Sequence, residues 1–181
     1  MADLIDITYF VYEVNLPTGG TYSDVPNFIA RYEKEILTEL LGYELYALVA
    51  ASTETSGRLY DLINGKDYTV SHNGRDQKVH WNGLKNTDKI SLIAYYVYCK
   101  YNQAKATSES GSGSTKSKHE NSYNADLSMK IMDAWHRMRE LYGYNGQDKL
   151  APSCYNFLTE YADTYPEWVF SEIGNVNAFD L

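Results

Sequence analysis

The sequence has few of the residues and patterns that mark specialised classes of protein. Only two of its 181 residues are cysteines, and Cys99 and Cys154 lie far apart with no CxxC pattern. We therefore expect a reducing compartment and no disulfide framework. No apolar run approaches the ~20 residues of a membrane span, and the N-terminus carries no secretory signal. These absences predict a protein without a membrane segment, made in the cytoplasm.

Positive charge is also scarce. The 16 lysines and arginines are outnumbered by 24 aspartates and glutamates, so the formal net charge is −8. This balance excludes a protein that wraps nucleic acid with a basic surface. An acidic surface remains compatible with DNA that passes close by without binding, because like charges repel.

Signatures of catalysis are missing as well, since the sequence has no Walker loop, no GxSxG and no HExxH. The nearest approach to a metal site is His72 and His80, which flank a predicted turn beside Asp76 and could face each other. Polar hairpin tips are commonly solvated, so we predict no metal, no cofactor and no catalytic residue. Cys99 is interpreted as a small buried hydrophobe. Three glutamates are interpreted as a solvated outward face of the first long helix: Glu33, Glu35 and Glu39.

Helical spacing of apolar residues dominates the chain. It predicts a helix over about 25–42 that Gly42 ends or bends, a second short helix, and a central helix that begins at Asn86 or Thr87. A further helix is closed by Gly143, and Ser153 opens a last one. The sequence therefore predicts a mainly α (α+β) fold, built as a small helical bundle.

Three segments depart from the helical period. Alternating residues around Asn73-Gly74 predict a β-hairpin over about 68–81 with a type I′ turn. Residues 4–16 are rich in Ile, Val, Tyr and Thr and predict an extended segment or strand. Residues 106–118 are low in complexity and predict a long polar loop. This loop contains Lys116 and Lys118, which suit an acidic neighbour or a DNA phosphate.

Tyrosine is what the sequence has in excess, with 18 Tyr against 5 Phe and 3 Trp. The central helix contains Tyr95, Tyr96, Tyr98 and Tyr101, whose rings point in several directions around it. One interpretation places one side in the core and leaves the other rings partly exposed. The other, which we favour, packs the helix on its own domain and on adjacent subunits, because Tyr and Trp are enriched at interfaces. The apolar tail over 167–181 is likewise expected to dock on the domain or on a partner.

The order of these features resembles the head–tail connector (adaptor, or head-completion) proteins of tailed bacteriophages over about residues 25–143. The stretches that carry the resemblance are Glu35-Ile-Leu-Thr-Glu-Leu-Leu-Gly42, Leu45-Tyr46, Leu62-Ile-Asn-Gly65, the Tyr-rich hairpin, Trp81-Asn-Gly-Leu84, Ile93-Ala-Tyr-Tyr-Val-Tyr98, Glu120-Asn-Ser, Trp135 and Leu141-Tyr-Gly143. Within one domain over 1–181, residues 1–24 then form an N-terminal extension. Residues 144–181 form a C-terminal helix and docking tail.

The resemblance implies a non-enzymatic virion protein at the head–tail junction. Copies, commonly twelve, form a ring below the portal protein, which extends the DNA channel and docks the next neck or tail protein. DNA passes through without specific binding. The alternatives are another neck or tail-completion protein and a small enzyme or ligand-binding domain. The residues predicted at subunit or partner interfaces are Tyr68, Asn73, Trp81, Tyr95, Tyr98, Lys116, Lys118, Trp168, Phe170 and Phe179.

Overall fold

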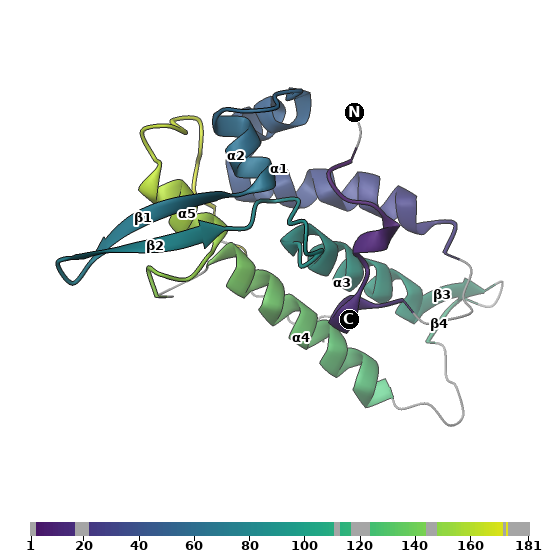
Figure 1. Ribbon diagram of the computed structural model, residues 1–181. Coiled ribbons are helices and arrows are strands. Elements are labelled where there is room, and N and C mark those ends of the chain that lie inside the picture. Colours follow the sequence, from purple (N-terminus) through teal and green to yellow (C-terminus); the bar gives the residue numbers. More distant parts are fainter. Residues whose placement is uncertain are drawn as a thin grey trace.

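Three long helices form the centre of the molecule in the computed structural model, which describes residues 3–16, 22–110, 113–116, 124–143, 148–171 and 173. They are α1 (Val25–Ala51), α3 (Leu92–Ala106) and α4 (Asn124–Tyr142). Helix α3 lies between the other two and packs against both (Figure 1). The predicted mainly α fold with a hairpin is confirmed. In the part of the chain that is described, no helix has the length and apolarity that a membrane crossing requires.

Helix α3 begins later than predicted. Neither Asn86 nor Thr87 caps it; Ser91 does, since the backbone N–H of Ile93 donates to the Ser91 hydroxyl oxygen at 3.2 Å. The Asn86 carboxamide instead organises the preceding loop, where its oxygen accepts from the N–H of Asp88 at 2.9 Å. Serine and asparagine both favour helix caps and turns, because their side chains bond to nearby backbone groups. The residue type alone therefore does not show which of them caps α3.

Helix α1 bends where the sequence predicts. Gly42 has φ 76° and ψ 159°, which interrupts the helical backbone between two helical halves. A positive φ combined with a ψ of about 160° is essentially confined to glycine. The second half therefore takes a new direction at this residue and continues to Ala51.

The N-terminal residues do not form the predicted extended strand. Residues 3–16 contain two short 3₁₀ helices, Ile7–Tyr9 (η1) and Tyr12–Val14 (η2), and we call this segment the arm. Its buried side chains pack into the core. The partial alternation of apolar residues was misleading, because a strand needs a pairing partner and η2 packs on α3 and α4 instead.

The predicted hairpin is confirmed with a slightly longer span. Strands β1 (Lys66–His72) and β2 (Arg75–Trp81) pair antiparallel, with His72 opposite Arg75. The turn residues Asn73 and Gly74 have φ of 52° and 73°. Positive φ at both positions is what a type I′ turn requires.

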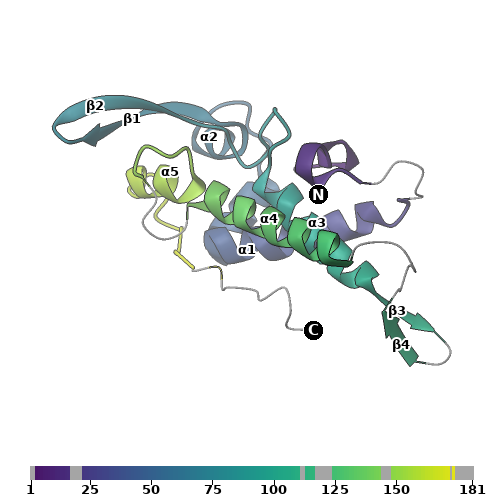
Figure 2. The same ribbon diagram turned by 90° about the horizontal axis from the view of Figure 1, so that it is seen from below.

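The predicted polar loop is partly a second hairpin. Strands β3 (Thr107–Ser110) and β4 (Gly113–Lys116) pair antiparallel directly after α3. Strand pairing is made by backbone groups and needs no apolar side chains, which is why composition did not reveal it. Figures 1 and 2 show the two hairpins extending from opposite ends of the helical centre.

Two short helices complete the fold. Helix α2 (Arg58–Asn64) precedes the first hairpin, and α5 (Cys154–Glu160) follows α4. Ser153 caps α5, as predicted, by accepting from the N–H of Asn156 at 3.3 Å. After α5 the chain returns over α2 and α1, and we call residues 164–171 the strap.

Candidate subunit and partner interface

The base of the first hairpin is buried within the chain. Tyr68 and Trp81 are 4% and 3% exposed, and both rings pack on Phe157 of α5 with ring centroids 5.6 Å and 5.7 Å away. The Trp81 indole N–H donates to the Leu62 carbonyl at 3.1 Å. Both residues were predicted at an interface. That prediction is corrected here, because α5 already covers this face of the hairpin.

The tip of the same hairpin is exposed. Burial ends at Val70 and Val79, beyond which every residue of the strands and turn is exposed or partly exposed. Asn73, predicted at an interface, is in this exposed part. The tip projects from the body and is joined to it only through its own strands (Figure 2). It is therefore accessible to a partner along its full outer length.

The tyrosines of α3 are buried in one chain rather than shared with a neighbour. Tyr95 and Tyr98 are 2% and 4% exposed, and Tyr96 and Tyr101 are also buried. The arm, α1 and α4 cover this helix from different sides. The predicted interface role of Tyr95 and Tyr98 is corrected for that reason. The description of α3 as a helix packed on more than one side is right, but all the covering elements belong to the same chain.

Two of these tyrosines satisfy their hydroxyls with acidic partners. The Tyr95 hydroxyl donates to the Glu13 carboxylate of the arm at 2.9 Å, and the Tyr96 hydroxyl donates to Glu35 of α1 at 2.6 Å. Burial, then the bond to Glu13, raises the pKa of Tyr95 to about 12. Burial raises the pKa of Tyr96 still further. These hydroxyls stay protonated at neutral pH and tie α3 to the arm and to α1.

The described part of the tail docks on its own domain. Trp168 is half-buried, and its indole N–H donates to the Leu40 carbonyl at 3.1 Å. Phe170 packs against Tyr142 and Tyr155 but remains 47% exposed. Of the two predicted tail contacts, Trp168 is therefore committed to α1, and Phe170 retains surface for a partner.

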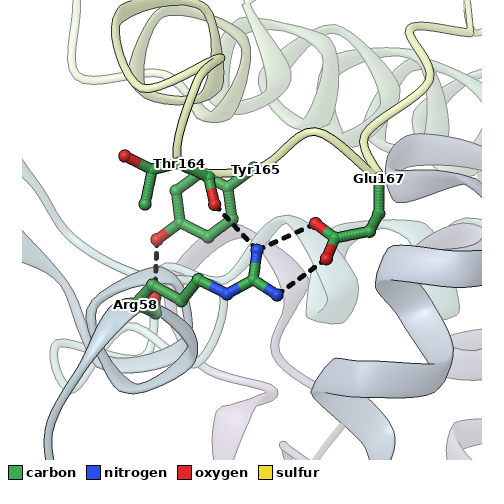
Figure 3. A network of polar contacts seen from close by, with 4 residues as sticks. All are labelled: Arg58, Thr164, Tyr165 and Glu167. Atoms are coloured by element: carbon green, nitrogen blue, oxygen red, sulfur yellow. Dashed lines mark hydrogen bonds and ion pairs between the residues drawn. The ribbon is translucent and has the colours of Figure 1, made fainter.

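A polar network fixes the strap to α2 (Figure 3). The Arg58 guanidinium donates to both carboxylate oxygens of Glu167 at 2.7 Å and 2.8 Å, and to the Thr164 carbonyl at 2.7 Å. The Tyr165 hydroxyl donates back to the Arg58 carbonyl at 2.5 Å. The forked geometry of arginine suits such a bidentate contact. The network is structural, since each group is satisfied by the others.

Three predicted interface residues lie beyond what the structure describes. Lys118 and Phe179 are outside the described residues. Lys116 is in β4, where only the backbone is described. The cation cluster predicted for the polar segment therefore stays a prediction.

The exposed apolar surface lies largely at residues that the sequence analysis did not select. Tyr43 is 73% exposed, just after the kink of α1, and Val169 of the strap is 65% exposed. Val169 lies against the kink itself, because a Cβ at Gly42 would lie 3.4 Å from that of Val169. Only the kink, which the sequence did signal, could have suggested this contact. The other large apolar residues that are exposed are Ile7, Tyr12, Leu48, Tyr60, Met129, Met132 and Phe170.

One glutamate of α1 is buried, against expectation. Glu33 is 6% exposed, and its carboxylate accepts from the backbone N–H groups of Leu4 at 2.8 Å and Ile5 at 3.2 Å. Burial raises the pKa of Glu33 to about 7, and nearby Asp3 adds to the rise. The prediction of an outward, solvated Glu33 is wrong because the arm covers it. Glu35 is exposed as predicted, and Glu39 is half-buried.

Glu33 also lines a cleft of about 410 Å³ between the arm, α1 and α2. Apolar residues such as Leu37 and Val49 form much of its wall, with Glu54 and Lys85 among the charged groups. The Glu33 carboxylate in this cleft is already bonded to the backbone of the arm.

The two histidines of the first hairpin do not face each other. The register places His80 opposite Asp67, with a contact between His80 Nδ1 and the Asp67 carboxylate, and His72 opposite Arg75. The expectation that His72 and His80 could face each other is therefore wrong. The described residues contain no group of three or more His, Cys, Asp or Glu that would hold a metal ion.

Both cysteines should be inert to thiol reagents in the native protein. Cys99 and Cys154 are fully buried, as predicted for Cys99, and burial raises the pKa of each thiol to about 12. The reactive species is the thiolate. At pH 8 we expect no labelling by a chromogenic disulfide within the time that labels a denatured sample, in which two thiols per chain react. Rapid native labelling of either thiol would contradict this burial.

Comparison with protein-family models, with curated proteins and with solved structures finds no match to this chain.

Proposed function

We propose that this protein is a non-enzymatic subunit of the neck of a tailed bacteriophage. In this proposal, copies of the chain form a ring below the portal protein, extend the DNA channel and provide the docking surface for the next neck or tail protein. The sequence pattern over about residues 25–143 suggests this role. What the structure adds is a shape that suits it.

The observation that carries the proposal is the pair of hairpins at opposite ends of the helical centre (Figures 1 and 2). A closed ring requires heterologous contacts, in which one face of a subunit meets a different face of the next. A subunit with projections at two separated ends has distinct surfaces for such contacts. The exposed part of the first hairpin provides one of them, around Asn73.

Charge and exposed apolar residues also support the proposal. The net charge of −8 suits a channel through which DNA moves without binding. Tyr43, Val169 and Phe170 add apolar and aromatic area at the surface. Aromatic residues of this kind are enriched where proteins meet.

Co-expression with the portal protein of the same genome tests the proposal. We expect negative-stain electron microscopy to show closed rings of the chain stacked on the portal, with one fixed copy number. A chain that remains monomeric and separates from the portal during size-exclusion chromatography would contradict it. Rings that form without portal binding would favour the other neck or tail-completion protein.

A pair of charge reversals tests the part played by the hairpin. Arg75→Glu changes the exposed tip, whereas Lys34→Glu makes the same change in net charge on the exposed side of α1. We expect Arg75→Glu to reduce the fraction of chains in rings, with Lys34→Glu close to the unmodified protein. Equal ring formation by both variants would exclude the hairpin tip as a contact.

A further inference from the structure

The kink in α1 leaves a weak point in the longest helix of the molecule. Gly42 has a non-helical ψ of 159°, so the backbone departs from the repeat on which i→i−4 hydrogen bonds depend. Carbonyl groups just before such a break need other donors. The Leu40 carbonyl is one of them, two residues before the glycine.

The strap contacts the weak point directly. The Trp168 indole N–H donates to the Leu40 carbonyl at 3.1 Å. The side chain of the next residue, Val169, lies against Gly42, where an added Cβ would meet it at 3.4 Å. Two consecutive residues of the strap thus supply a hydrogen bond and a packing contact at the site of the break.

The strap is held on each side of this contact by a small number of bonds. On the N-terminal side, Arg58 binds Thr164 and Glu167, and the Tyr165 hydroxyl binds the Arg58 carbonyl. On the C-terminal side, the Tyr142 hydroxyl donates to the Ser171 carbonyl at 2.7 Å.

The ion pair in this attachment is partly open to water, since the side chains of Arg58 and Glu167 are 33% and 24% exposed, whereas Tyr165 is 2% exposed and packs on Phe157. Ion pairs with such access to solvent contribute little to stability. Val169 and Phe170 of the strap also remain 65% and 47% exposed.

We propose that residues 166–171 of the strap, which follow the buried Tyr165, are a detachable lock on the kink of α1. When it is seated, it fixes the angle between the two halves of the helix; when it leaves, the second half is free to turn at Gly42. That half carries Tyr43, which is 73% exposed, and Leu48, which is 37% exposed. Detachment therefore changes the direction in which the exposed side chains of Tyr43 and Leu48 point. This lock does not depend on the ring proposed above, and it holds for the isolated chain.

Hydrogen–deuterium exchange of the full chain tests the coupling. Arg58→Gln removes the bidentate pair and weakens the bond to Thr164. We expect amide exchange to rise about threefold both in the strap and in residues 42–48 of α1. Exchange in β1 and β2 is expected to stay unchanged. Arg75→Gln, the same substitution at the exposed hairpin tip, is the control and should leave both regions as in the unmodified chain.

Trp168→Phe separates the lock from the attachment, because it keeps an aromatic ring and removes the indole N–H donor together with part of the ring area, while the bonds of Arg58 stay in place. We expect faster exchange in residues 42–48 and little change around Arg58. Strap exchange that rises in Arg58→Gln while residues 42–48 stay protected would overturn the proposal. Unchanged protection of residues 42–48 in Trp168→Phe would overturn it too, as would a uniform rise across the whole chain in Arg58→Gln.

Discussion

Replacing Gly83 with alanine is expected to lower the free energy of unfolding by about 3 kcal/mol or more. After β2 the chain crosses the end of α2, and two backbone bonds bring the segments together: Leu84 N–H to the Leu62 carbonyl at 3.1 Å and Lys85 N–H to the Ile63 carbonyl at 2.9 Å. Gly83 has φ +81°, and a Cβ there would lie 2.5 Å from the Ile63 carbonyl oxygen. The new methyl group meets rigid backbone, so α2 and the loop must separate.

Gly74→Ala is the matched control for this prediction. Gly74 also has a positive φ, +73°, but nothing lies within 4 Å of the position of its Cβ. Alanine at position 74 therefore lowers the free energy of unfolding only by the conformational penalty of about 1–2 kcal/mol. Urea denaturation followed by circular dichroism measures both variants. Equal losses of stability would show that close approach at Gly83 is not what requires glycine there.

Stability is expected to fall as the pH rises from about 4.5 to 7, by about 3 kcal/mol from Glu33 alone. The pKa of this carboxyl is raised from 4.5 to about 7 in the folded chain, because burial disfavours its charged form. Below pH 4.5 both states are protonated and the contribution is fully present. Between the two values the unfolded chain releases a proton that the folded chain retains, so each step upward in pH favours unfolding.

Glu33→Gln should remove this slope, since the amide does not titrate. Its oxygen still accepts from one of the two backbone N–H groups of the arm, at Leu4 or Ile5. Glu44→Gln, at an exposed position of the same helix, is the control and should preserve the slope. Urea titrations at several pH values between 4.5 and 7.5 give the comparison. A slope that survives in Glu33→Gln would mean that another group is responsible.

Local signals in the sequence predicted the features that depend on one or two residues. Asn73-Gly74 identified the turn of the first hairpin, and Gly42 identified the bend in α1, because in each case a positive φ is required and few residues tolerate it. Helical spacing identified the long helices for the same local reason, since each presents its apolar residues to the centre.

Features that depend on residues distant in the chain could not be predicted in this way. Glu33 is buried because the arm, 28 and 29 residues earlier, supplies the two N–H donors that it needs. The arm in turn avoids a strand because it packs on α3 and α4. No pattern within either segment contains that information.

At the candidate interface, too, local features could be predicted from the sequence and contacts between distant segments could not. The spacing of the tyrosines in α3 correctly predicted a helix that is covered on several sides. Spacing alone, however, cannot show whether the cover comes from a neighbouring subunit or from the arm of the same chain. Eight of the sixteen described tyrosines are buried, including all four on α3. The exposed Val169 lies against α1 only because the helix bends at Gly42 and the strap returns over it.

The placement of the three tryptophans gives the protein a set of built-in optical reporters. Trp81 stacks on Phe157 where the first hairpin meets α5. Between α4 and α3, the ring centroids of Trp135 and Tyr96 lie 5.8 Å apart. Trp168 marks the strap on α1. Replacing any two of them with phenylalanine leaves a single tryptophan, whose fluorescence reports on one junction. The order in which the three junctions open during unfolding can then be read from intrinsic fluorescence, without any attached label.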